Sequence, residues 1–280
     1  MAAPFPGTPS RRVTSPDGTP IAVFTAGAGP ALVLVHGTTG DHRTWRVVAP
    51  ELAGRHTLHA IDRRGRGDSG DGPAYAIEHE LEDLAAVAEA IARQTGVPVD
   101  VVGHSLGGRI ALGASLRSPN IRRVVAYESA PAAPAGPGPG RGPRRDDLVE
   151  RLRADLAAGD LERVLVTFMT EATGMTAEAL AHFRADPVWP LRVAAAPTIV
   201  RELAAADEAE AVSMAALSRV AVPVLQLVGS ESPASFREGA VALDGGLPEG
   251  HLVVIEGAGH AAHHSHPAAF VAAVEAFLAG

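Results

Sequence analysis

The chain has 280 residues, of which 46% are hydrophobic, and its formal net charge at pH 7 is −8. This length is enough for one domain with a large core, with or without an inserted subdomain. The acidic balance and the lack of a long basic run argue against nucleic acid or an anionic membrane surface as a partner. The chain has no cysteine, which excludes disulfides, thiol nucleophiles and cysteine-ligated metal sites.

The N-terminal segment, MAAPFPGTPSRR, contains no charged start followed by an apolar stretch, so it does not resemble a signal peptide. Its prolines and glycine predict a loose leader. No later apolar run is long enough to span a bilayer. We therefore expect a cytoplasmic protein, either a monomer or a homodimer.

Short apolar and β-branched runs along the chain predict strands. They cover residues 21–27, 31–37, 56–62, 99–104, 122–128, 222–229 and 251–257. Helical patterns lie between most of them, and residues 77–95 carry apolar side chains at the spacing of an amphipathic helix. The alternation predicts an α/β fold with a mostly parallel sheet covered by helices on both faces.

One interval interrupts this alternation. The Pro/Gly segment SAPAAPAGPGPGRGPRR, residues 129–145, predicts a linker, and residues 146–218 are mostly helical by pattern. We expect residues 134–205 to form a helical cap over the carboxyl ends of the strands. The core then comprises residues 1–133 and 206–280. The alternative is a set of ordinary helices that pack on the sheet.

The stretch Gly103-His104-Ser105-Leu106-Gly107 fits the G-x-S-x-G pattern between a predicted strand and a predicted helix. A nucleophilic serine needs a sharp turn there, with small neighbours and with the free amides of a helix N-terminus nearby. Ser105 is therefore the candidate nucleophile. Two backbone amides are candidate oxyanion donors: that of Leu106, and that of Thr38 in the turn after the second strand.

A serine hydroxyl needs a base, and His260 lies in a glycine-rich loop after the last predicted strand. We expect His36, near the oxyanion turn, to be structural. Three more histidines follow His260, and the alternative interpretation of this group is a metal site. We instead expect them to line the loop or face solvent, because no acidic residue lies among them; they are His263, His264 and His266.

These motifs together resemble the α/β-hydrolase fold family over nearly the whole chain, from about Val13 onward. The resemblance includes the HG turn, DRRGRGDS, GHSLGG, the cap interval and the late GAGH. It implies a Ser…acid…His triad and no metal or organic cofactor. It also implies that Asp62, in DRRGRGDS, organises a loop, so the RGD letters do not indicate integrin binding.

The triad acid is not at the family's usual position, three residues beyond a glycine after the strand that follows the cap. Ser232 occupies that position here, and its neighbour Glu231 is one alternative. Glu128 is the other, at the end of the strand before the cap linker. The resemblance favours Glu128, because certain haloalkane dehalogenases and the zearalenone-type lactone hydrolases place their acid after this strand.

We therefore expect a serine hydrolase that cleaves an ester, lactone or thioester of a small, apolar molecule through an acyl-enzyme. Cofactor-free perhydrolases, C–C bond hydrolases and non-catalytic ligand-binding proteins on this fold are the alternatives. Three insertion residues are candidates for substrate binding, although their helical spacing also fits a core of the cap itself: Phe168, Met169 and Trp189.

Overall fold

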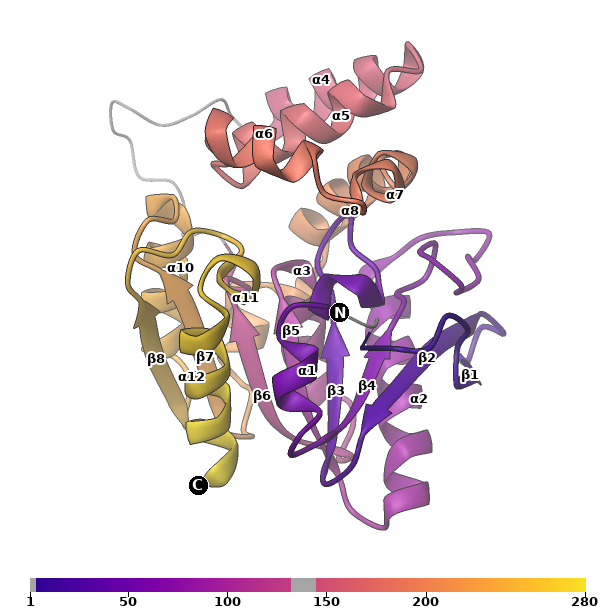
Figure 1. Cartoon of the computed structure of the whole chain (residues 1–280), viewed down its shortest axis with the longest axis vertical. Coiled ribbons are helices and arrows are strands. Elements are labelled where there is room, and N and C mark those ends of the chain that lie inside the picture. Colours follow the sequence, from indigo (N-terminus) through magenta and orange to yellow (C-terminus); the bar gives the residue numbers. More distant parts are fainter. Residues whose placement is uncertain (1–3, 132–144) are drawn as a thin grey trace.

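The computed structural model describes residues 4–131 and 145–280, and these residues form an eight-stranded sheet flanked by helices (Figure 1). The sheet order is β1-β2-β4-β3-β5-β6-β7-β8. The first two strands pair antiparallel with their neighbours, and all other pairs are parallel. The predicted α/β class with a mostly parallel sheet is therefore confirmed. The strands are β1 (Arg11–Thr14), β2 (Pro20–Gly27), β3 (Ala31–Val35), β4 (Thr57–Ile61), β5 (Val99–His104), β6 (Ile121–Tyr127), β7 (Val224–Gly229) and β8 (Gly250–Ile255).

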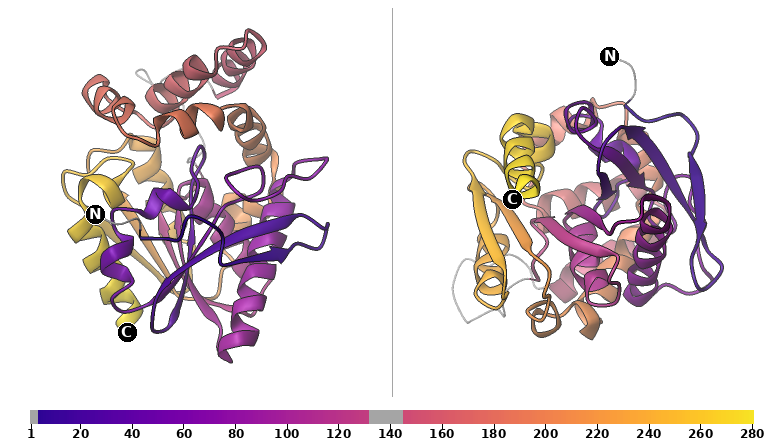
Figure 2. Two further views of the ribbon diagram at one scale, coloured as in Figure 1. Left: turned by 45° about the vertical axis from the view of Figure 1, so that its right-hand side comes forward. Right: turned by 90° about the horizontal axis from the view of Figure 1, so that it is seen from below.

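Helices cover both faces of the sheet, which lies between them in both views of Figure 2. On one face, α2 (Ile77–Thr95), α3 (Leu106–Ser115) and α10 (Ala234–Asp244) share a core cluster with the strands. On the other face, α1 (Ala49–Leu52) and α12 (Pro267–Ala279) form a second cluster with them. The short elements in the connections are η1 (His42–Trp45), η3 (Glu210–Val212), α9 (Met214–Leu217) and α11 (Ala262–Ser265).

Between β6 and α9 the described residues form helices, and we call residues 145–208 the helical insertion. Its helices lie beyond the carboxyl ends of the parallel strands (Figure 1) and enclose a third core cluster of their own. Residues 132–144, with most of the predicted linker and the predicted cap start at residue 134, lie outside the described residues. The insertion contains α4 (Arg145–Ala157), α5 (Leu161–Thr167), η2 (Phe168–Ala172), α6 (Ala177–Arg184), α7 (Trp189–Ala194) and α8 (Pro197–Glu208).

The N-terminal segment differs from the expected loose leader. Phe5 is only 6% exposed and packs in the second core cluster, and Arg11–Thr14 forms the edge strand β1. Four residues with two arginines carry no apolar alternation, so the sequence pattern does not reveal a strand that pairs with only one neighbour. No helix in the described part of the chain is long and apolar enough to cross a membrane.

Candidate active site

Ser105 lies on a strained turn between β5 and α3. Its backbone has φ 52° and ψ −124°, a conformation that residues with a side chain rarely adopt. The Ser105 N–H donates to the Tyr127 carbonyl over 2.8 Å, which ties the turn to the neighbouring strand. A Cβ on Gly107 would lie 2.4 Å from the His36 carbonyl oxygen, so this position needs glycine for the helix to approach the sheet.

Glu128 and His260 contact each other directly. Glu128 Oε2 lies 2.6 Å from His260 Nδ1, and the Glu128 side chain is fully buried. The other carboxylate oxygen accepts the Gly229 N–H over 2.9 Å and the Ser232 hydroxyl. A buried carboxylate with three donors has a fixed orientation, and so has the imidazole that it holds.

The two other residues considered for the acid have different surroundings. Ser232, at the family's usual acid position, donates its hydroxyl to Glu128. Glu231 is exposed, and no hydrogen bond in the described part of the chain joins its carboxylate to His260. The strand ends of β6 and β7 are adjacent in the sheet, since Tyr127 pairs with Leu227. An acid on either strand can therefore reach the same histidine.

Two residues that sequence reasoning missed hold the loop that carries His260. The Tyr127 hydroxyl donates to the Gly259 carbonyl and accepts the Ala262 N–H over 3.1 Å. The His104 Nε2 lies 2.8 Å from the His260 carbonyl oxygen. Burial, then the nearby His260, lowers the pKa of His104 well below its usual range, so this ring is neutral and donates from Nε2. His104 lies within the G-x-S-x-G motif and Tyr127 directly precedes Glu128, but the loop is more than 130 positions away from both in sequence.

The oxyanion turn, residues Gly37–Gly40, packs against the serine. A Cβ on Gly37 would lie 3.1 Å from Ser105 Cβ and 3.0 Å from the His104 carbonyl oxygen. Thr38 and Leu106, the residues whose amides are candidate oxyanion donors, both line the cavity that contains Ser105. In addition, Leu106 begins α3, so its N–H belongs to the free first turn of that helix.

This cavity brings Ser105, Glu128 and His260 together and encloses about 480 Å³, including space open to solvent. Residues of the helical insertion line part of it, among them Phe168, one of the three candidates for substrate binding. The other two expected contacts do not line it: Met169 is buried in the core of the helical insertion, and Trp189 packs against that core. Lining residues that sequence reasoning missed are Arg109, Ala172, Thr173, Glu202, Leu203, Ala206 and Phe236.

Backbone strain is concentrated at this site. In the described part of the chain, the non-glycine residues with positive φ are Thr39 (69°), Ser105 (52°) and Glu128 (49°). Each such residue costs of order 1–3 kcal/mol, and strain of this kind clusters at functional sites. Thr39 lies in the oxyanion turn, Ser105 lies in the turn between β5 and α3, which we call the elbow, and Glu128 carries the buried carboxylate.

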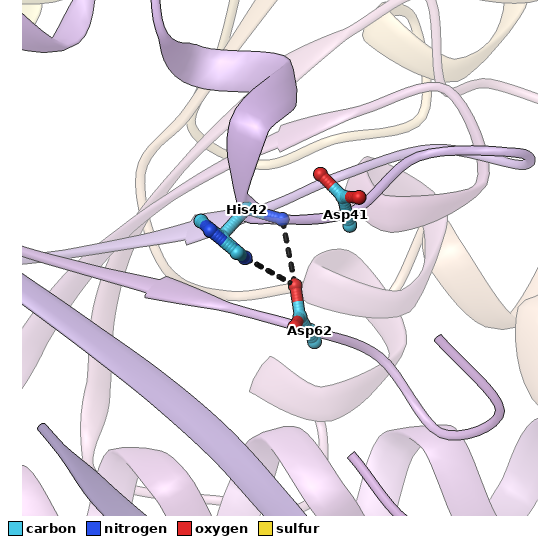
Figure 3. A group of neighbouring side chains, drawn as sticks. All are labelled: Asp41, His42 and Asp62. Carbon is cyan, nitrogen blue, oxygen red and sulfur yellow. Dashed lines mark hydrogen bonds and ion pairs between the residues drawn. The ribbon is translucent and has the colours of Figure 1, made fainter. Parts of the chain in front are cut away.

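A second cluster, separate from this cavity, consists of Asp41, His42 and Asp62 (Figure 3). Their ligand atoms lie within 4.8 Å of one another, a spacing that suits a metal ion. However, Asp62 Oδ1 accepts the His42 N–H over 2.7 Å and faces His42 Nδ1 at 2.8 Å, while Oδ2 accepts the Asp68 N–H over 2.9 Å. Asp62 thus organises the loops around it.

Two further histidines near the site, His36 and His263, are buried, so His263 does not face solvent as one expectation had it. His36 Nε2 accepts the Arg63 N–H over 3.0 Å, and burial lowers the pKa of His36 well below its usual range. His263 is buried among aromatic rings, including Trp45 and Phe270, and burial lowers its pKa in the same way. His263, His264 and His266 do not form a group with metal-ligand spacing in the described part of the chain.

Comparison with known proteins shows the family of the chain. Residues 32–274 match the model of the alpha/beta hydrolase family. The chain is 29% identical over 266 residues to a pimeloyl-acyl-carrier protein methyl ester esterase from Aeromonas hydrophila subsp. hydrophila, a match that covers 92% of this chain and 99% of that protein.

Solved structures agree with the match. An α/β hydrolase from Sphaerobacter thermophilus is 33% identical with a TM-score of 0.77, and the alignment covers 93% of this chain and 100% of the other. An enol-lactonase from Burkholderia xenovorans shares the fold at 20% identity, with a TM-score of 0.70 and coverage of 96% and 100%. The chain therefore belongs to the α/β-hydrolase family.

Proposed function

We propose that this chain hydrolyses carboxylic esters through an acyl-enzyme on Ser105, with His260 as base and Glu128 as the acid of the triad. The observation that carries the proposal is the cavity shared by these three residues, in which the Glu128 carboxylate lies 2.6 Å from His260 Nδ1. The relatives named as esterases support ester substrates for this chain as well.

In this mechanism the Ser105 hydroxyl attacks the ester carbonyl carbon, and His260 Nε2 takes the hydroxyl proton. Glu128 accepts a hydrogen bond from the His260 Nδ1–H and stabilises the imidazolium that forms. The carbonyl oxygen becomes an oxyanion, which accepts hydrogen bonds from the Leu106 and Thr38 amides. Collapse of the intermediate expels the alcohol, which receives the proton from His260. Water then attacks the acyl-enzyme by the same route and releases the acid.

We further propose that the helical insertion acts as a cap that shapes the acyl or alcohol pocket. Phe168 and Leu203 bring apolar surface to the cavity from the insertion, and Phe236 brings it from α10. We propose a small, largely apolar substrate for this lining, to which Arg109 and Glu202 also bring charged groups, and the proposed mechanism uses no metal or organic cofactor. Lactones and thioesters remain alternative substrates, because the same triad opens them by the same steps.

The test combines substrate profiling with a serine control. Purified protein is assayed with aryl esters, macrolactones and acyl thioesters, and it is treated with a fluorophosphonate probe. Ser105→Ala should abolish both turnover and labelling while the fold is retained. Ser115→Ala, which removes a hydroxyl from the other end of α3, should change neither. Substantial ester turnover by Ser105→Ala would contradict the proposal, and labelling without turnover would favour perhydrolase or C–C bond hydrolase activity.

A further inference from the structure

Arg192 connects the helical insertion to the oxyanion turn. It lies on α7 and is only 9% exposed. Its guanidinium donates to the Thr39 hydroxyl over 3.3 Å and to the Thr44 hydroxyl over 2.9 Å. These bonds join residues about 150 positions apart in sequence, and both threonines are buried. The insertion therefore contacts the turn that carries Thr38 through a side chain withdrawn from solvent.

The charge of Arg192 is unusual for a buried arginine. No carboxylate in the described part of the chain lies within ion-pair distance of it, and two neutral hydroxyls accept its hydrogen bonds. Burial lowers the pKa of Arg192 to about 10, so it still carries its charge at neutral pH. Asp41, next to the oxyanion turn, and Asp186 attract this charge without an ion-pair contact, while its hydrogen bonds go to the hydroxyls of Thr39 and Thr44. A buried charge is costly unless its surroundings compensate for it.

The turn that Arg192 contacts is strained. The Gly40 N–H donates to the Gly37 carbonyl over 3.2 Å, which makes Thr39 the third residue of a tight turn. Thr39 has φ 69°, and a β-branched residue in this region is an outlier. A Cβ on Gly40 would lie 3.0 Å from Arg192 Nη1, so a side chain at this position would crowd the guanidinium.

We propose that Arg192 is a positioning residue that holds the strained Thr39 in the oxyanion turn, so that the helical insertion completes the oxyanion hole of the core. This inference rests on the proposed function, because it concerns the amide of Thr38 that would face the oxyanion. An amide displaced from its position loses much of its effect on the transition state, while ground-state binding of the ester changes little. The expected signature is thus a loss in kcat.

The kinetic test uses Arg192→Met and a matched control. With 4-nitrophenyl butyrate, Arg192→Met should lower kcat by about 10- to 100-fold with little change in KM. Inhibition by phenylboronic acid, whose tetrahedral adduct fills the oxyanion hole, should weaken by a similar factor. Arg46→Met breaks another contact between core and insertion, the ion pair with Asp186, and should keep wild-type kcat. Equal losses in the two variants would overturn the proposal.

A second variant keeps the test valid if Arg192→Met folds poorly. Arg192→Lys retains the charge but has one ammonium for two hydroxyls, so its kcat should be intermediate.

A double-variant test asks whether Arg192 acts through Thr39. Thr39→Val removes the hydroxyl and keeps the shape of the side chain. If Arg192 acts through Thr39, the double variant Arg192→Met/Thr39→Val should lose no more kcat than Arg192→Met alone. Additive losses would show that Arg192 acts elsewhere.

Hydrogen exchange tests the positioning without turnover. The Gly40 amide reports the turn, because it is bonded to the Gly37 carbonyl. Its exchange should be at least about 10-fold faster in Arg192→Met than in the wild type and unchanged in Arg46→Met. Unchanged exchange in Arg192→Met would overturn the proposal. If the wild type neither hydrolyses esters nor reacts with a fluorophosphonate, the proposed function fails, while the exchange result still decides whether Arg192 holds the turn.

Discussion

At the residue scale, the proposed triad acid Glu128 lies on a different strand from the family's usual acid position, yet its carboxylate contacts His260. Its backbone takes φ 49°, and its carboxylate accepts bonds from the end of β7, including the Ser232 hydroxyl. Ser232 lies where the family usually has its acid, and here its hydroxyl donates to Glu128, the proposed acid on the neighbouring strand. The strained conformation of Glu128 is compensated by these buried bonds.

This arrangement predicts the effect of Glu128→Gln, which keeps the size of the side chain but removes its charge. The imidazole then loses control of its tautomer and compensation for its positive charge, so kcat should fall by about 10³- to 10⁴-fold. Glu231→Gln is the control, because that side chain is exposed, and it should cost less than about threefold. Steady-state kinetics with an aryl ester measures both. A larger loss in the Glu231 variant would contradict the assignment of Glu128.

At the scale of elements, the sequence predicts those strands, helices and turns that are determined by residues close together in the chain. The central strands, helix α2 and the elbow at Ser105 follow from apolar spacing and from the glycines that the turn requires. Edge strand β1 pairs with β2, the next strand along the chain, but its two arginines hide any apolar alternation. The contact of Arg192 with Thr39 joins distant segments, so no window of sequence contains it. For the same reason, helical spacing could not decide whether Met169 lines the cavity or the insertion core.

The end of β6 and the loop before α11 provide a prediction at this scale. Tyr127→Phe removes the hydroxyl that bonds both Gly259 and Ala262, on either side of His260. The loop then loses its anchor, and kcat should fall about 10-fold with little change in KM, because His260 is less well oriented. The free energy of unfolding should fall by about 1–3 kcal/mol, since partners are left unpaired.

Tyr75→Phe is the matched control for this variant. It also removes a tyrosine hydroxyl from a hydrogen bond, here to Glu80 on α2, but Tyr75 does not line the cavity that contains Ser105. It should lower the stability of the protein and leave kcat unchanged. Denaturant unfolding and ester kinetics on both variants separate the two effects. A kcat loss that is equal in both would mean that Tyr127 acts through stability alone.

At the scale of the whole molecule, the fold keeps several histidines neutral. Burial is the main cause of a lowered pKa at His36, His59, His104, His263 and His264, with values of about 4 for His59 and about 3 for His264. In the unfolded chain these rings take up protons near pH 6.5. Below that pH the unfolded state therefore binds more protons than the folded state, and the free energy of unfolding falls as the pH falls.

The last prediction follows from this proton balance. The melting temperature should be nearly constant above about pH 7 and should fall by several degrees between about pH 6.5 and 5, a window above the usual pKa of carboxylates.

His263→Phe should reduce the pH dependence of the free energy of unfolding by up to about 1.4 kcal/mol per pH unit, because one titrating ring is lost. It should also raise stability at pH 6, since His263 Nδ1 has no hydrogen-bond partner in the described part of the chain and packs among aromatic rings. His182→Gln, at an exposed position of α6, is the control and should leave the pH dependence unchanged. Calorimetry across this pH range measures all three proteins, and a His263→Phe curve parallel to that of the wild type would show that His263 is already protonated in the folded state.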